Sequence, residues 1–151
     1  MEKMKKVEIK TDASAWKDGQ TGKVLRAGWA FVIYDEKGQE LYHQLHKLYP
    51  TEEAIELTEI RCEMMALIAA LHWLNQNRQY KAVFKSDSRT MVNGILGLAK
   101  RRANHDLWDK MEEEVRSAFN QIEDICYISR EDNARANSLA NQAAGAIFIA
   151  A

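Results

Sequence analysis

The hydrophobic pattern of the chain changes its period near Pro50, the only proline, and this change constrains the fold more than any other feature of the sequence. Before Pro50, apolar side chains alternate with polar ones or form short β-branched and aromatic runs, which is typical of strands. After it, apolar residues recur every three or four positions over long segments, which is typical of amphipathic helices. Short apolar runs separate these segments. The pattern therefore predicts three strands, followed by helices that alternate with strands.

The predicted strands and helices are bounded by turn residues. Strands are predicted at 6–11, 28–34, 39–48, 81–86 and 125–129, and the polar segment 16–26 is predicted to be a loop. Helices are predicted from the apolar stripes at 60–74, 91–98, 107–122 and 136–147. The long helix should begin just after Thr58.

The order of these segments predicts the topology of the sheet. Three consecutive strands joined by short connections form an antiparallel meander, whereas strands separated by helices run parallel to the first strand. We therefore expect an α/β fold with a five-stranded mixed sheet flanked by helices. The 151 residues should form a single domain over 1–151, large enough for one hydrophobic core.

Composition excludes several classes of protein. The 21 basic and 22 acidic residues give a net charge of −1, so a polyanion must be bound by a local patch or through metal ions. Two cysteines are too few for a disulfide framework or a four-cysteine zinc site. The apolar run at 143–151 is shorter than the roughly 20 residues of a membrane helix. These features lead us to expect a cytoplasmic protein without a membrane segment.

Three acidic residues stand at places where an α/β sheet binds ligands. Asp12 and Asp87 each follow a predicted strand, and ligands bind beyond the carboxyl ends of parallel strands. Glu63 borders the buried stripe of the long helix, where an unpaired charge is costly. Mg²⁺ binds such oxygen ligands, and two such ions stabilise an in-line phosphoryl displacement. The alternative is that the aspartates only form turns and that Glu63 is an ordinary helix acid.

Five short motifs occur along the chain in one order. The motifs are Thr11-Asp12-Ala13-Ser14, Thr58-Glu59-Ile60-Arg61-Cys62-Glu63, Asp87-Ser88, Asn104-His105-Asp106-Leu107-Trp108, and the segment from Arg130 to Ala140 with the sequence REDNARANSLA. Together they resemble the patterns T-D-G-S, T-N-N-x-A-E, D-S, N-x-D-L-W and R-E-x-N-x-x-A-D-x-L-A of the type 1 ribonuclease H family. The resemblance extends over nearly the whole chain and implies a ribonuclease H-like fold.

The resemblance also implies an activity. Members of this family hydrolyse the RNA strand of an RNA–DNA hybrid and leave 3′-hydroxyl and 5′-phosphate ends. It implies two Mg²⁺ ions, which Mn²⁺ can replace, with Asp12 bridging both. Glu63 and Asp87 would complete the metal site on the leaving-group side, and a fourth acid would help to hold the other ion. We expect a monomer that binds the hybrid.

The chain departs from the family pattern at the fourth acid, where Asn137 stands in place of aspartate. Its carbonyl oxygen can still contact a metal ion, but one negative charge is lost. Three interpretations follow: an engineered substitution that suppresses activity, a natural variant with weaker or rearranged metal binding aided by Asp132, or a domain that has lost catalysis. The last of these makes the chain a non-catalytic domain that binds nucleic acid or a protein partner.

The candidate contacts to nucleic acid are polar side chains near the acids and one short basic run: Ser14, Thr58, Ser88, Arg89, Lys100, Arg101 and Arg102. A few phosphate contacts of this kind make binding salt-dependent. Thr58 also fits a helix N-cap, and the basic run also fits a solvated helix end. The family's two amides after the motif threonine are replaced by Glu59 and Ile60. Asn133 is predicted to cap the last helix, with orientation of the site as the alternative role.

Overall fold

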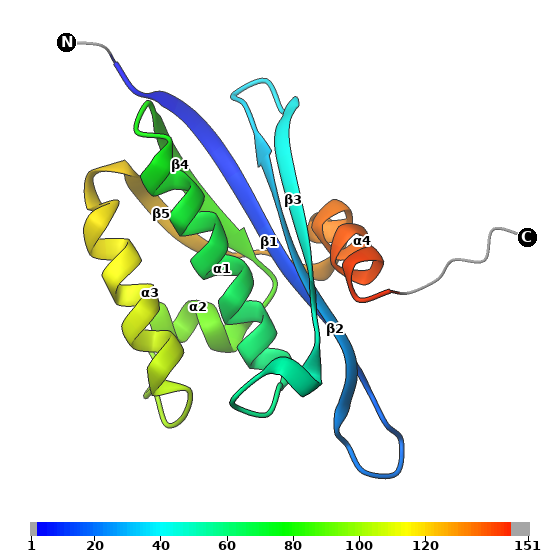
Figure 1. The fold of residues 1–151 in the computed structure, drawn as a ribbon. Helices are drawn as coiled ribbons and strands as arrows, with labels where there is room; N and C mark the ends of the chain where they lie inside the picture. The colour runs from blue at the N-terminus through cyan, green and yellow to red at the C-terminus, as the bar shows by residue number, and fades with distance from the viewer. Residues whose placement is uncertain (1–2, 146–151) are drawn as a thin grey trace, which may run out of the picture.

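A single five-stranded sheet with helices on both faces organises the computed structural model, which describes residues 3–145 (Figure 1). The strands are β1 (Lys5–Lys17), β2 (Val24–Tyr34), β3 (Glu40–Leu48), β4 (Tyr80–Ser86) and β5 (Ile122–Tyr127). The helices are α1 (Glu59–Gln76), α2 (Arg89–Ile95), α3 (His105–Ser117) and α4 (Ala134–Ala143). Short 3₁₀ turns lie at Pro50–Glu52, Phe119–Gln121 and Arg130–Asn133.

The strand order is β3-β2-β1-β4-β5. β1, β2 and β3 pair antiparallel, while β4 pairs parallel to both β1 and β5. The predicted meander with added parallel strands is therefore confirmed, as is the five-stranded mixed sheet.

β1 is longer than the sequence pattern predicts. It was expected to end at Thr11, yet it continues to Lys17 and carries Asp12 within the strand. The cause is β2, whose residues from Val24 onward pair with this extension and reduce the predicted loop at 16–26 to a hairpin turn. The parallel pairing with β4 does stop at Thr11, opposite Ser86. On that side of the strand, Asp12 is the first residue beyond the paired end.

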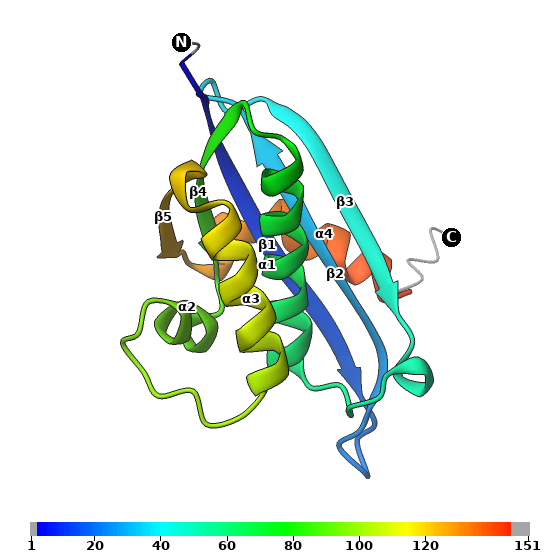
Figure 2. The same ribbon diagram turned by 60° about the vertical axis from the view of Figure 1, so that its left-hand side comes forward.

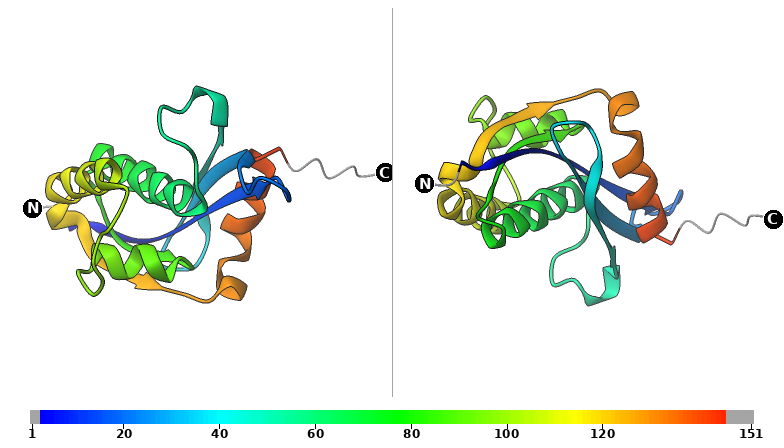
Figure 3. Two further views of the ribbon diagram at one scale, coloured as in Figure 1. Left: turned by 90° about the horizontal axis from the view of Figure 1, so that it is seen from below. Right: turned by 90° about the horizontal axis from the view of Figure 1, so that it is seen from above.

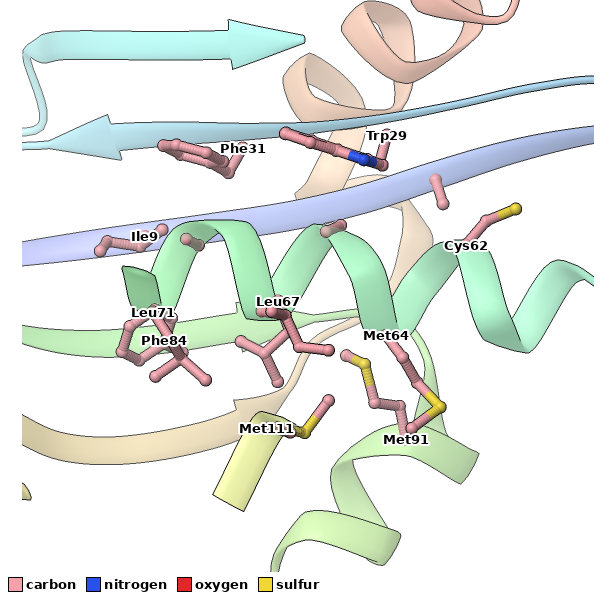
Figure 4. Packing of buried hydrophobic residues seen from close by; sticks show 14 of the residues in the cluster. Ile9, Trp29, Phe31, Cys62, Met64, Leu67, Leu71, Phe84, Met91 and Met111 are labelled. Atoms are coloured by element: carbon pink, nitrogen blue, oxygen red, sulfur yellow. The ribbon is translucent and has the colours of Figure 1, made fainter. Parts of the chain in front are cut away.

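Helices α1 and α3 cover one face of the sheet and α4 covers the other (Figures 2 and 3). The main core lies between the sheet and α1, and Figure 4 shows Leu67 and Leu71 of α1 packed near Ile9, Phe31 and Phe84 of the sheet. The second core, under α4, is much smaller and consists of Ala30, Val32, Ala136, Leu139 and Ala140. The two faces of the sheet are therefore packed by two separate hydrophobic cores of different size.

α4 approaches the sheet very closely at Gly28. A Cβ atom at this position would lie 2.6 Å from the backbone nitrogen of Ala144 and 2.7 Å from the Cβ of Ala143. Only glycine allows this distance between β2 and the end of α4.

The C-terminal third differs from prediction in its boundaries. α3 ends at Ser117 instead of reaching Ile122, because the buried Gln121 turns inward and its Nε2 lies within 3.1 Å of three backbone carbonyl oxygens. β5 begins earlier than predicted as a result. α4 ends at Ala143, and Ile147, predicted to extend it, lies outside the described residues. Within 3–145, no helix combines the length and apolarity needed to cross a membrane.

Candidate active site

Three acidic side chains from separate elements converge at the edge where β4 ends. Asp12 comes from β1, Glu63 from α1 and Asp87 from the turn after β4, and each offers a carboxylate oxygen within 4.8 Å of the others. Among residues 3–145, this is the only group of at least three acidic, histidine or cysteine side chains placed to share a metal ion. The prediction that these three residues lie together is therefore confirmed.

The start of α1 determines where Glu63 lies. Thr58 caps the helix, since its hydroxyl accepts a hydrogen bond from the backbone N–H of Arg61 at 3.3 Å. The Arg61 guanidinium then binds Asp106 of α3 through two hydrogen bonds of 3.0 and 2.8 Å. These contacts fix the first turn of α1 against α3 and hold Glu63 near the end of β4.

Burial makes the cluster electrostatically unfavourable without a cation. Asp12 is only 2% exposed and Glu63 7%. Burial, with a further contribution from the charge of Asp87, raises the pKa of Asp12 to about 6. Burial and the charges of the neighbouring Asp12 and Asp87 raise the pKa of Glu63 well above its usual value. Burial also raises the pKa of Asp87, although the charge of Arg130 opposes the shift.

The cluster fits a divalent cation. The Oε2 atom of Glu63 is buried and has no hydrogen-bond partner among the described residues. A hard cation such as Mg²⁺ would bind this oxygen together with those of Asp12 and Asp87, and it would offset their mutual repulsion. An open cleft of about 330 Å³ lies in front of the three acids and leaves room for a substrate.

The metal-free protein should lose stability as pH rises. The pKa of Asp12 is near 3.8 in the unfolded chain and about 6 in the folded one, so between these values the folded state binds more protons. Stability then decreases across this window by about 3 kcal/mol, at 1.36 kcal/mol per pKa unit. The ion pair that lowers the pKa of Asp106 to about 2 is already complete at the lower end of this window, so it does not mask the effect.

Thermal unfolding in EDTA between pH 4.5 and 7.5 measures this dependence. The melting temperature should fall with pH in EDTA, and Mg²⁺ should raise it more at pH 7 than at pH 5. A metal-free melting temperature that rises over this range would contradict the assignment of Asp12 as a buried acid with a raised pKa.

Asn137 of α4 lies against the cluster from the other face of the sheet. Its Nδ2 donates to Oδ2 of Asp12 at 3.0 Å, and the backbone N–H of Ala13 donates to the other Asp12 oxygen at 2.8 Å. The position of the fourth family acid is thus adjacent to Asp12, as the motif predicts. An amide nitrogen, however, faces the carboxylate.

Comparison with known proteins identifies the family. A family profile described as reverse transcriptase-like matches residues 10–143. The domain that this profile describes is ribonuclease H-like. The chain belongs to the ribonuclease H family. No curated protein sequence matches it.

Solved structures of ribonucleases H superpose on nearly the whole chain. LC11-RNase H1, isolated from compost by a metagenomic approach, gives a TM-score of 0.77 at 28% identity and covers 95% of this chain and 98% of its own. LC11-RNase H1 in complex with an RNA/DNA hybrid gives 0.73 at 27% identity, covering 93% and 97%. RNase H1 from Halobacterium salinarum shares the fold at 23% identity, with a TM-score of 0.70 and coverage of 91% and 96%.

Some of the other predicted residues lie at the cleft in front of the three acids, and others lie outside it. Ser88 lines the cleft and caps α2, and Arg89 lies nearby with its guanidinium 4.4 Å from the centre of the Tyr127 ring. Thr58 is exposed at the start of α1. Ser14 instead points toward α4 and donates to Asn141 at 2.7 Å.

The basic run lies in the connection between α2 and α3. Lys100 and Arg102 are exposed there. Arg101 is only partly exposed, because it binds the carbonyl oxygen of Gly94, pairs with Glu112 and stacks over Trp108 at 4.6 Å. Two of the three basic side chains therefore remain available to solvent.

Two functional residues behave differently from the sequence prediction. Asn133 occupies the N-cap position of α4 but makes no capping hydrogen bond; its Nδ2 instead donates to the Thr11 carbonyl at 2.9 Å. The capping prediction is wrong, and Asn133 ties the segment before α4 to β1 beside Asp12. Arg130 was not singled out, yet it lines the cleft and its charge lowers the pKa of Asp87. The motif R-E-x-N contained this signal.

Proposed function

We propose that this ribonuclease H hydrolyses the RNA strand of RNA–DNA hybrids with the help of Mg²⁺. The observation that carries the proposal is the buried cluster of Asp12, Glu63 and Asp87 at the floor of an open cleft. A protein retains three mutually repelling carboxylates, two of them buried, at a cost in stability, which a bound cation offsets. The likeness to LC11-RNase H1, which was crystallised with an RNA/DNA hybrid, supports the choice of substrate.

Asp12, Glu63 and Asp87 would hold Mg²⁺ or Mn²⁺, and the family resemblance implies a second ion at the same site. When bound, such a cation stabilises the charge that develops at a phosphoryl group and lowers the pKa of a bound water. In the proposed reaction, water forms a new bond to phosphorus while the P–O3′ bond breaks, which leaves a 5′-phosphate and a 3′-hydroxyl.

Other residues that line the cleft would position the substrate. Arg130 lies at the wall of the cleft next to Asp87 and offers a guanidinium for a phosphate of the RNA strand. Ser88 and Thr90 line the same cleft and offer hydroxyls that can bind the backbone or a 2′-hydroxyl. Recognition of the 2′-hydroxyl distinguishes RNA from DNA at such a site.

Cleavage of a labelled RNA–DNA hybrid tests the proposal. With Mg²⁺ or Mn²⁺, the RNA strand of the hybrid should be cut, while duplex RNA and duplex DNA of the same sequence should remain intact. Asp87→Asn serves as the control, because it removes a cluster charge without changing the side-chain size. Absence of hybrid cleavage by both the protein and its Asn137→Asp variant would refute the enzyme assignment and favour a non-catalytic binding domain.

Asn137→Asp should increase Mg²⁺-dependent cleavage of the hybrid. The new carboxylate would lie beside Asp12 and add an oxygen ligand and a charge for the second cation. We expect a rise of about tenfold, the lower end of the usual effect of a change next to a metal ligand. Without metal the same variant should be less stable than the protein with asparagine, since a fourth acid then repels Asp12. Equal or lower cleavage would contradict the assignment of position 137 to the metal site.

A further inference from the structure

Three polar side chains on α4 and β1 form a continuous chain of hydrogen bonds that ends on Asp12. The hydroxyl of Ser14 donates to Oδ1 of Asn141 at 2.7 Å. Nδ2 of Asn141 donates to Oδ1 of Asn137 at 3.2 Å, and Nδ2 of Asn137 donates to Asp12 at 3.0 Å. Ser14 is 9% exposed and the two asparagines are half-buried, so little water competes for these bonds.

The three bonds run in one direction toward Asp12, whose carboxylate only accepts hydrogen bonds. An asparagine amide has a donor end and an acceptor end. Because the Asn141 oxygen accepts from Ser14, its amino group is free to donate only on the other side, toward Asn137. The Asn137 oxygen is then occupied, and its amino group faces Asp12.

We propose that Ser14 and Asn141 are positioning residues that orient Asn137 as a hydrogen-bond donor to Asp12. The Asn137 side chain thus holds the Asp12 carboxylate through an N–H. The carbonyl oxygen of Asn137, the only atom of this side chain that can bind a metal ion, faces Asn141. The cation site formed without substrate then consists of Asp12, Glu63 and Asp87 alone and binds one ion. The inference rests on the proposed function only in assigning Asp12 to the cation.

Asn141→Asp tests the direction of these hydrogen bonds. Aspartate at 141 still accepts from Ser14 but cannot donate to Asn137. The Asn137 amide should therefore reverse, donate to residue 141 and present its oxygen to the cation site. In the metal-free protein, the side-chain ¹⁵N–¹H resonances of Asn137 should shift, and calorimetry should show Mg²⁺ binding tighter by about tenfold or at a second site.

A double variant controls for the added charge. Asn137→Ala combined with Asn141→Asp carries the same new charge without the amide, so its Mg²⁺ binding should return to that of the unchanged protein. Ser14→Ala should also shift the Asn137 resonances, and Ser14→Thr, which keeps the hydroxyl, should restore them. A purely structural role of Ser14 would change stability without moving these resonances.

Two results would overturn the inference. The first is equal Mg²⁺ affinity of Asn141→Asp and the double variant, which would show that charge alone acts. The second is unchanged Asn137 resonances in Asn141→Asp. Neither measurement uses cleavage, so a protein that shows the expected resonances and binding but cuts no hybrid would refute the proposed function and leave this inference standing.

Discussion

Glu63→Gln is expected to abolish hybrid cleavage and, in the absence of metal, to make the protein more stable. The substitution preserves the size of the side chain and places a neutral amide beside Asp12 and Asp87. It removes a ligand charge, and a loss of about 4 kcal/mol of transition-state stabilisation lowers the rate about 10³-fold. It also replaces a buried acid with a neutral amide and so removes its repulsion with the two aspartates, which should stabilise the metal-free protein at neutral pH.

Single-turnover cleavage of the hybrid and urea unfolding in EDTA measure the two effects. Glu113→Gln is the matched control, because Glu113 is an exposed acid on α3 that belongs neither to the cluster nor to the lining of the cleft. It should leave both quantities unchanged. A Glu63→Gln variant that cuts at more than a tenth of the normal rate would show that Glu63 is not a ligand of the cation.

Gly28→Ala should be the most destabilising single-methyl change in the sheet. The added Cβ would lie 2.6 to 2.8 Å from atoms of Ala143 and Ala144, two of which belong to the backbone, so α4 must move away from β2. Overpacking of this kind costs about 3 kcal/mol. For a chain of this size, the melting temperature should then fall by about 6–12 °C. The displaced α4 should also weaken the contact between Asn137 and Asp12.

Gly19→Ala is the matched control for this change. No atom lies within 4 Å of a Cβ placed at Gly19, so the same methyl group meets only solvent there. Thermal unfolding followed by circular dichroism compares the two variants. If Gly28→Ala melts within 2 °C of Gly19→Ala, the close packing of α4 on β2 is not as described.

The sequence predicts the sheet and the acidic cluster because both depend on local patterns. Alternating and 3.6-residue periods mark the elements, and the parallel strands bring the ends of β1 and β4 to one edge. The length of β1 is not local, since its extension to Lys17 exists only through pairing with β2. The inward turn at Gln121 is equally hidden, because its partners lie more than 40 positions earlier.

The direction of the Asn137 amide was also beyond sequence reasoning. A motif shows that Asn137 replaces an acid, but not which end of the amide faces Asp12. That orientation depends on Asn141 and on Ser14, which lies 127 positions away from Asn141 in the chain. The motif R-E-x-N includes Arg130, but the motif does not show that the turn at Arg130–Asn133 brings this residue to the cleft.

The site joins two packing layers of very unequal size. The carboxylates of Asp12, Glu63 and Asp87 are held by β1, by α1 and by the turn after β4, and these elements enclose the main core. Asn137 instead belongs to a helix held by five buried side chains of modest size. Local opening requires less free energy where less apolar contact is lost. Amide hydrogens of α4 should therefore exchange with solvent sooner than those of α1. Such partial opening would release the amide partner of Asp12 from time to time while the three acids stay together.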